Sequence, residues 1–265
     1  MLDVLIERLK QGHRTLKYPA EPPALPERYA GLPQVNGSRC PEGCQACAEA
    51  CPTGAVRLGG PEPSLDLGKC LFCRECEEAC PEGAIRFTQD HRLAVRERQD
   101  LLLRENGLPL ARALEEKSRR LFGRSLKLSQ VSAGGCNACE TDVNVLSTIV
   151  FDLARFGIQF VASPRHADGL VITGPVTENM RLALQKTYDA TPAPKIVVAV
   201  GACAISGGPY IGHPEAHDGA GSFLPVDLYV PGCPPHPFTI LDGLLRLLGR
   251  LGEDRRPGGS AAGRI

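Results

Sequence analysis

The chain contains 265 residues, of which 43% are hydrophobic, and its 30 lysines and arginines balance 30 aspartates and glutamates. With about 150 residues per domain as a guide, this length and composition predict two folded domains and exclude a disordered chain. The net charge of zero leaves no basic field that would attract nucleic acid or an anionic membrane surface.

Twelve cysteines are the unusual feature of the composition. Residues 1–20 contain no apolar segment typical of a signal peptide, because charged side chains such as Glu7, Arg8 and Lys10 interrupt each candidate. The longest apolar run, Ile196–Ile205, is far shorter than the roughly 18 residues that span a bilayer. We therefore expect a soluble, cytoplasmic chain whose reduced thiols bind metal and do not form disulfides.

Residues 1–39 are expected to form a short helix followed by a proline-rich arm. Leu2, Leu5, Ile6 and Leu9 recur at helical spacing, and the pattern stops at Gly12. Prolines then fix the backbone and remove hydrogen-bond donors, so the arm should lie extended over a surface of this chain or of a partner. A flexible leader is the alternative interpretation. The prolines are Pro19, Pro22, Pro23, Pro26 and Pro33.

Residues 40–90 carry eight cysteines in two similar blocks. The run Cys47-Ala-Glu-Ala-Cys51-Pro-Thr-Gly-Ala-Val56 matches Cys76-Glu-Glu-Ala-Cys80-Pro-Glu-Gly-Ala-Ile85. An internal repeat this close predicts two copies of one small unit that pack together, since neither copy buries its apolar side alone.

The second block has the spacing of bacterial ferredoxins that hold two [4Fe-4S] clusters, in which the fourth cysteine binds the other cluster. It reads Cys70-x2-Cys73-x2-Cys76-x3-Cys80-Pro81, and the first block reads Cys40-x3-Cys44-x2-Cys47-x3-Cys51-Pro52. Crosswise ligation would give one cluster Cys40, Cys44, Cys47 and Cys80, and the other Cys51, Cys70, Cys73 and Cys76. The extra residue before Cys44 makes Cys40 the ligand that the spacing supports least.

A pair of four-cysteine zinc sites is the alternative for this segment, because such sites also use C-x2-C pairs. Zinc ribbons separate their two pairs by a long loop, however, and need neither a third cysteine two residues on nor a Cys-Pro pair. The pattern therefore favours iron–sulfur clusters, and the segment resembles the two-[4Fe-4S] ferredoxin family as a small α+β domain.

Residues 91–124 are predicted to be a basic, helical connector between the domains. Over residues 91–135 there are ten lysines and arginines against five acidic residues. Pro109 could begin a helix, with Leu110, Ala113, Leu114 and Leu121 at helical spacing. We expect a solvated linking helix, and docking against an acidic subunit is the alternative.

Residues 125–253 alternate strands and helices, which predicts an open, mostly parallel, flavodoxin-like α/β sheet. Residues 254–265 are rich in glycine, arginine and serine and are expected to be a disordered tail. The strands are expected at Leu126–Val131, Gln159–Ala162, Gly169–Thr173, Lys195–Val200 and Val226–Val230, and the helices at Asp142–Phe156, Thr177–Tyr188 and Pro237–Leu251.

The last four cysteines each follow one of these strands. Cys136 and Cys139 follow the first, Cys203 follows Lys195–Val200, and Cys233 follows Val226–Val230. Loops at the carboxyl ends of parallel strands converge on one crevice, so the four thiols should form a third [4Fe-4S] site. The alternative is that Cys203 and Cys233 are buried thiols that act as small hydrophobic residues. Glycines that allow close backbone approach accompany the loops, namely Gly134, Gly135, Gly201 and Gly232.

Motifs over roughly residues 115–250 resemble the cluster-carrying small subunit of membrane-associated [NiFe]-hydrogenases, including formate hydrogenlyase and other energy-converting hydrogenases. The same segment is similar to the 20 kDa subunit of complex I (NADH:quinone oxidoreductase). The motifs are Gly134-Gly-Cys136-Asn-Ala-Cys139-Glu140, Phe156-Gly-Ile-Gln-Phe-Val-Ala-Ser163-Pro-Arg-His166-Ala-Asp168, Thr173-Gly-Pro175, Gly201-Ala-Cys203-Ala-Ile-Ser-Gly-Gly208 and Pro231-Gly-Cys233-Pro-Pro235.

Residues 1–90 resemble the separate two-cluster ferredoxin-type subunit of the same complexes, so the chain looks like a fusion of two neighbouring subunits. The complex I subunit presents two adjacent cysteines, whereas this chain has Cys136-x2-Cys139 followed by Glu140. This departure favours the hydrogenase branch.

The resemblance implies that the α/β domain binds the proximal [4Fe-4S] cluster and docks onto a catalytic large subunit. It implies an electron-transfer subunit of an oxidoreductase complex, with three clusters and no catalytic centre of its own, that serves a multisubunit [NiFe]-hydrogenase. The alternative is a relay to quinone, as in complex I. The [NiFe] centre or quinone would belong to the large subunit. Other iron–sulfur or membrane subunits would hold the chain, which has no transmembrane segment, on the inner face of the cell membrane.

A function of a different class is a non-enzymatic zinc or iron–sulfur protein that senses redox state through its interactions. Metal content separates this hypothesis from the electron relay, since stoichiometric zinc would support only the former.

Glu140 is the one carboxylate that we expect near the proximal cluster. It is a candidate proton relay at the large-subunit interface, in which case Glu140→Gln would keep all clusters and slow H2 turnover. The alternative is a carboxylate that stabilises the N-terminus of the predicted helix Asp142–Phe156. His166 and His213 are expected in loops near the same crevice, and neither is assigned as a metal ligand.

Overall fold

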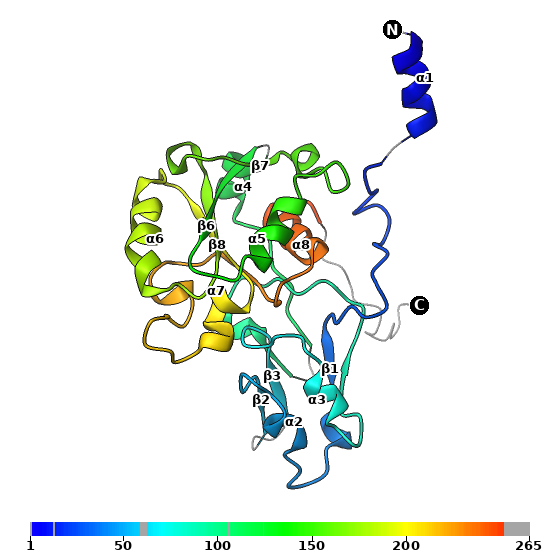
Figure 1. The fold of residues 1–265 in the computed structure, drawn as a ribbon, viewed down its shortest axis with the longest axis vertical. Coiled ribbons are helices and arrows are strands. Elements are labelled where there is room, and N and C mark those ends of the chain that lie inside the picture. Colours follow the sequence, from blue (N-terminus) through cyan, green and yellow to red (C-terminus); the bar gives the residue numbers. More distant parts are fainter. Residues whose placement is uncertain (1, 13, 59–62, 105–106, 124, 252–265) are drawn as a thin grey trace, which may run out of the picture.

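The computed structural model describes residues 2–12, 14–58, 63–104, 107–123 and 125–251. Figure 1 shows a cysteine-rich lower half, an α/β upper half, and a short helix that projects away from both. The predicted tail at 254–265 lies outside the described residues.

The lower half contains two small antiparallel sheets. Strand β1 (Pro33–Val35) pairs with β4 (Ile85–Phe87). Strand β3 (Ser64–Asp66) pairs with β2 (Val56–Arg57) and with β5 (Leu102–Leu103). Helices α2 (Ala46–Glu49) and α3 (Glu75–Glu78) contact each other and carry Cys47 and Cys76. The sequence repeat is therefore also a structural repeat.

The upper half is a five-stranded parallel sheet with the order β10-β9-β8-β6-β7. Numbered along the sheet by chain order, this is the 2-1-3-4-5 arrangement of flavodoxin, and the predicted fold class is confirmed. All residues of β8 and β9 are buried, as expected for central parallel strands with helices on both faces. The strands are β6 (Leu126–Ser132), β7 (Ile158–Phe160), β8 (Gly169–Thr173), β9 (Ile196–Val200) and β10 (Leu228–Val230).

Helix α8 (Pro237–Leu247) is the central helix of the upper half, and every one of its residues is buried. Its start is fixed locally, because the Nδ1 atom of His236 accepts a hydrogen bond from the backbone N–H of Phe238 and Pro237 occupies the first turn. The other helices are α4 (Glu116–Phe122), α5 (Ala138–Val145), α6 (Glu178–Ala190) and α7 (Ala202–Ser206). Helical 3-10 turns lie at Gly37–Arg39, Arg98–Leu101, Leu153–Phe156, Pro164–His166, Gly208–Tyr210 and Ala220–Ser222.

The predicted helix Asp142–Phe156 is wrong in its position. The structure has α5, which begins at Ala138 and ends at Val145, and a separate 3-10 turn at Leu153–Phe156. The positive φ of Asn137 starts the helix next to the cysteine loop, and Thr141 Oγ1 donates back to the Asn137 carbonyl. The positive φ of Asp152 then prevents one continuous helix.

Other element boundaries differ by a few residues. Strand β7 covers Ile158–Phe160 where Gln159–Ala162 was predicted, and β9 and β10 begin one and two residues later than expected. Helix α6 covers Glu178–Ala190, and α8 ends at Leu247, short of the predicted Leu251.

The connector is packed into the molecule, which contradicts the expected solvated linking helix. No helix begins at Pro109, and α4 starts only at Glu116. Val95 exchanges two backbone hydrogen bonds with Tyr229 of β10, at 3.0 and 2.9 Å. Five apolar side chains explain the packing, since Leu93, Val95, Leu101, Leu103 and Leu108 are all buried. The connector joins both halves.

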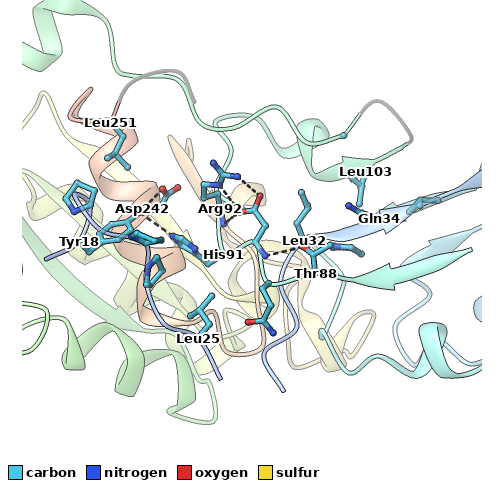
Figure 2. Close-up of a pocket in the computed structure, with 18 of the residues that line it drawn as sticks. Tyr18, Leu25, Leu32, Gln34, Thr88, His91, Arg92, Leu103, Asp242 and Leu251 are labelled. Atoms are coloured by element: carbon cyan, nitrogen blue, oxygen red, sulfur yellow. Dashed lines mark hydrogen bonds and ion pairs between the residues drawn. The ribbon is translucent and has the colours of Figure 1, made fainter. Parts of the chain in front are cut away.

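The proline-rich arm lies against this chain's own surface, and the flexible-leader alternative is wrong for residues 14–35. Its Tyr18 hydroxyl donates a 3.0 Å hydrogen bond to Asp242 Oδ1 on α8 and lies 3.3 Å from His91 Nε2. Figure 2 shows the groove between the arm and the body, with Tyr18, His91 and Asp242 in contact at one end. Helix α1 (Leu2–Gln11) differs, because none of its described residues is buried.

Candidate iron–sulfur sites

The first set of cysteines comes together from both blocks of the repeat. Burial raises the pKa of the Cys47 thiol, and the neighbouring Cys80, Cys40 and Cys44 raise it further. Cys80, although it lies in the second block, is thus close to the first three cysteines. This is the grouping that the crosswise pattern predicts, and it includes Cys40 despite the longer spacing.

The second set shows the reciprocal exchange. Burial raises the pKa of Cys70 strongly, and it raises the pKa of Cys76 to about 12, with Cys51 and Cys73 as neighbouring thiols of both. All four cysteines line one cavity of about 290 Å³, whose other walls include Val56, Leu65 and Phe87. The lining and the donor set fit a cubane cluster in an apolar pocket.

Backbone N–H groups point at the sulfur atoms in equivalent places of the repeat. The N–H of Ala55 donates to Cys51 Sγ at 3.2 Å, and the N–H of Ala84 donates to Cys80 Sγ at 3.2 Å. The intervening Gly54 and Gly83 both have φ of 59°, which turns each N–H back toward the thiol. Burial works to raise the pKa of Cys51, but these hydrogen bonds outweigh it and lower the pKa.

The third set gathers at the carboxyl edge of the parallel sheet. Burial and then the charges of Cys203, Glu140, Cys233 and Cys136 raise the pKa of Cys139. The pKa of Cys203 rises to about 11 through burial and the nearby Cys233 and Cys136. The four thiols therefore lie within electrostatic range, which argues against the alternative that Cys203 and Cys233 are isolated hydrophobic residues.

Two glycines make room for the thiols of the third set. A Cβ atom at Gly201 would lie 2.5 Å from Cys139 Sγ, and one at Gly208 would lie 2.9 Å from Cys203 Sγ. Both glycines also have positive φ, at 92° and 56°, so a larger residue would be strained there in two ways.

The donor chemistry of all three sets fits iron–sulfur clusters. Packed thiols with raised pKa values resist ionisation until a positive metal centre supplies compensating charge. Each set offers four sulfur atoms and no competing carboxylate or imidazole ligand was predicted for it. Among the described residues, no group of three or more His, Cys, Asp or Glu side chains is arranged around a single metal ion.

The three sets are also neighbours of one another. Cys47 of the first set influences Cys76 of the second, and Cys73 of the second set influences Cys233 of the third. The sets therefore follow one another from the bottom of the lower half to the sheet edge of the upper half (Figure 1).

Glu140 is buried in the first turn of α5, beside the third set. Its Oε1 atom accepts a 2.6 Å hydrogen bond from Thr173 Oγ1 at the end of β8. Burial would raise the pKa of Glu140, but hydrogen bonds with Ser132 and Thr173 outweigh it and lower the pKa. The carboxylate thus ties the start of α5 to two strands, as the helix-terminus interpretation expects, although the helix is α5 and not Asp142–Phe156.

The two loop histidines differ in location. His166 lies in the turn that precedes β8, at the amino edge of the sheet, so its expected place near the cysteine crevice is wrong. His213 follows α7 and is exposed, and its Nδ1 atom accepts a hydrogen bond from the N–H of Glu215.

A buried polar cluster on α8 was missed by sequence reasoning. Arg246 Nε donates to Asp242 Oδ2 at 2.8 Å, and both side chains are almost fully buried. An Asp and an Arg four residues apart in an otherwise apolar helix are the signal that could have revealed it.

Two protein-family models match the chain. The model for "NADH ubiquinone oxidoreductase, 20 Kd subunit" matches residues 136–247, and that for "4Fe-4S dicluster domain" matches residues 34–85. These matches cover the upper half and the cysteine-rich lower half in turn.

Curated relatives are subunits of redox complexes. A probable membrane-bound hydrogenase subunit, mbhJ of Pyrococcus furiosus, is 40% identical over 51% of this chain and 80% of its own length. Formate hydrogenlyase subunit 7 of Escherichia coli is 39% identical over 55% and 60% of the two chains. An NADH-quinone oxidoreductase subunit of Clostridium beijerinckii is 45% identical over 43% and 68%.

Among solved structures, a chain of the archaeal membrane-bound sulfane sulfur reductase has a TM-score of 0.45 and 34% identity, and covers 51% of this chain and 75% of its own. The identity to hydrogenase and quinone-oxidoreductase subunits confirms the resemblance inferred from the motifs. The chain belongs to the family of the 20 kDa subunit of NADH:ubiquinone oxidoreductase, and a 4Fe-4S dicluster domain precedes that segment in the same polypeptide.

Proposed function

We propose that this chain relays electrons through three [4Fe-4S] clusters to or from the catalytic large subunit of a multisubunit [NiFe]-hydrogenase. The coarser conclusion needs no proposal, since the relatives and the dicluster match identify an iron–sulfur electron-transfer subunit of an oxidoreductase complex. The number of clusters, their ligands and the hydrogenase partner are the proposed part.

The observation that carries the proposal is the succession of three four-cysteine sets. We assign Cys40, Cys44, Cys47 and Cys80 to one cluster, Cys51, Cys70, Cys73 and Cys76 to the next, and Cys136, Cys139, Cys203 and Cys233 to the proximal one. Thiols of adjacent sets influence each other electrostatically at Cys47 with Cys76 and at Cys73 with Cys233. Electrons need such a sequence of close stations to cross the chain.

The residues around these sets have defined tasks. The thiolates hold iron, and the apolar walls around Cys70 and Cys76 keep water away. The N–H groups of Ala55, Ala84 and Phe72 donate to ligand sulfur atoms, which favours the more negative, reduced state. The bound clusters supply the one-electron chemistry, and the protein controls ligation, burial and hydrogen bonding.

A complex I-like relay to quinone is the second candidate function. The 45% identity to an NADH-quinone oxidoreductase subunit supports it. The spacing Cys136-x2-Cys139 is the observation that favours the hydrogenase, because it departs from the adjacent cysteines of the complex I subunit.

Attachment to a membrane would come from partner subunits. Within the part of the chain that the structure describes, no helix combines the length and apolarity needed to cross a bilayer. We propose that the chain sits peripherally on the inner face of the cell membrane, held by a large subunit and by iron–sulfur or membrane subunits.

The partner subunit decides between the two functions. The complex is purified through an affinity tag on this chain, and the co-purifying large subunit is analysed for nickel and for H2 oxidation and evolution. We expect stoichiometric nickel held by four cysteines of that subunit, with H2 turnover. A partner without nickel, together with quinone reduction, would contradict the hydrogenase assignment and support the complex I-like relay.

A further inference from the structure

The second and third cysteine sets belong to different halves of the molecule, and one compact contact fixes the halves together beside them. On the upper side it uses α7, which carries Cys203 and ends at Ser206. On the lower side it uses the turn after β3 that leads directly into Cys70. Each side therefore reaches a cysteine ligand within a few residues.

A buried hydrogen bond crosses this contact. Ser206 Oγ lies 2.7 Å from the carbonyl oxygen of Gly68 and donates to it, while the carbonyl of Ala202 lies farther away at 3.2 Å. Ser206 is only 6% exposed. A buried hydroxyl with one proton has little freedom here, because loss of the Gly68 acceptor would change its best partner.

The turn at Gly68 is itself held on two sides. Its N–H donates to Asp66 Oδ1 at 2.9 Å, and Asp66 forms two further 2.9 Å hydrogen bonds with Arg98 of the connector. A Cβ atom at Gly68 would lie 2.7 Å from Arg98 Cζ and 2.8 Å from Ile205 Cγ2. Gly68 thus sits between the guanidinium and an α7 side chain with no space to spare.

Apolar packing extends the same contact. Ile205 and Ala204 of α7, with Tyr229 of β10, are buried in the hydrophobic cluster of the lower half. Arg96 Nε also donates to the Asp227 carbonyl at 2.7 Å, next to the paired Val95 and Tyr229. Relative motion of the halves would disrupt several of these contacts together.

We infer that Ser206, Gly68, Asp66 and Arg98 are positioning residues that set the separation between the second and the proximal cluster, and hence electron exchange between them. This inference rests on the proposed function, because it assigns clusters to both cysteine sets. The four residues touch no ligand sulfur directly. They act through the two short backbone segments that carry Cys70 and Cys203.

Magnetic interaction between reduced clusters is the readout, because it depends on their separation and orientation. Full-length protein is loaded with iron, reduced, and examined by EPR, with intramolecular electron transfer measured after rapid reduction. Ser206→Ala removes the hydroxyl of the contact. Thr191→Val is the matched control, since it removes a buried hydroxyl that donates to a backbone carbonyl at the end of α6.

We expect Ser206→Ala, with its full iron content, to lose or alter the interaction signal of the second and proximal clusters and to slow transfer between them. Thr191→Val should match the wild type in both measurements. Arg98→Gln provides a second variant should Ser206→Ala load iron poorly, and Arg181→Gln, which breaks an exposed ion pair on α6, is its control.

The outcomes separate this inference from the proposed function. Full iron in every variant with an unchanged interaction signal in Ser206→Ala or Arg98→Gln would overturn the positioning role alone. Full iron with no interaction in the wild type would also overturn it. A wild-type protein that holds zinc, or iron for only two clusters, would overturn the proposed function and this inference with it.

Discussion

Cys51 and Cys80 are the residues on which the ligand assignment depends most. Each follows one block of the repeat but groups with the cysteines of the other block. The fold explains the exchange, because helices α2 and α3 pack against each other and bring the end of each block beside the start of the next.

Iron content tests this crosswise assignment. Cys51→Ser should lose about four iron atoms, and Cys51→Ser combined with Cys73→Ser should lose no more, because both residues serve one cluster. Cys51→Ser combined with Cys80→Ser should lose about eight, since two clusters are then affected. Equal iron loss in the two double variants would contradict crosswise ligation.

Glu140 has two roles that a neighbouring substitution separates. Its carboxylate accepts a hydrogen bond from Thr173, and Glu140→Gln and Thr173→Val each disturb that bond. We expect each change to lower the free energy of unfolding by about 1–3 kcal/mol, because a buried polar partner is left poorly satisfied. Thermal unfolding of the loaded protein at one scan rate measures this effect.

Turnover in the complete complex decides on the proton relay. Slower H2 turnover in Glu140→Gln but not in Thr173→Val would support the relay, since only the first variant removes the ionisable group. Equal turnover in both variants and the wild type would leave Glu140 with the anchoring role alone and contradict the relay.

At the scale of elements, the arm is held to α8 by Tyr18. Its hydroxyl donates to the buried Asp242, so Tyr18→Phe leaves a charged acceptor with one partner fewer. We expect a loss of about 1–3 kcal/mol of unfolding free energy. Tyr210→Phe is the control, because Tyr210 is 46% exposed and should have little effect on stability. Equal stability of Tyr18→Phe and the wild type would show that the arm is not anchored there.

His91 lies between the arm, the connector and α8. Burial lowers its pKa below the ordinary 6.5, and the charges of Arg92 and Arg246 act in the same direction, while those of Asp242 and Asp90 act in the opposite direction. The Tyr18 hydroxyl and the Phe238 ring also face it. The folded protein therefore disfavours the imidazolium form of His91.

The sign of the pH effect follows from this lowered pKa. Below about pH 6.5 the unfolded chain binds a proton that folded His91 resists, so the His91 contribution to stability is present above that pH and is lost as pH falls. We expect His91→Gln to reduce the decline in unfolding temperature between about pH 8 and about pH 6. The exposed His213→Gln is the control, and an unchanged decline in His91→Gln would refute the assignment.

At the scale of the whole molecule, the sheet and the cysteine repeat could be predicted because their signals are local. Apolar runs such as Ile196–Val200 identify buried parallel strands, and the spacing from Cys70 to Cys80 describes cluster geometry within one short loop. The position of each cysteine after a strand then placed the third set at one sheet edge.

The parts that could not be predicted depend on contacts between distant residues. The connector looks like a solvated basic helix until Val95 pairs with Tyr229 and Arg98 with Asp66. The proline-rich arm gives no sign of which surface it covers before Tyr18 meets Asp242. The start of α5 was missed because Asn137 begins it from a left-handed conformation that the cysteine loop imposes.

The fusion of the two segments has a physical consequence at this scale. Buried contacts from the connector and α7 join the halves, so the separation of the cysteine sets is built into one chain and does not depend on subunit association. The cysteine sets then form a single path from the lower half to the sheet edge of the upper half (Figure 1).

The metal content of the purified chain, combined with EPR of its reduced form, tests the central claim most directly. Three four-cysteine sets predict about twelve iron atoms per chain and signals of [4Fe-4S] clusters. Stoichiometric zinc without those signals would contradict the electron relay and favour the redox-sensing interaction protein instead.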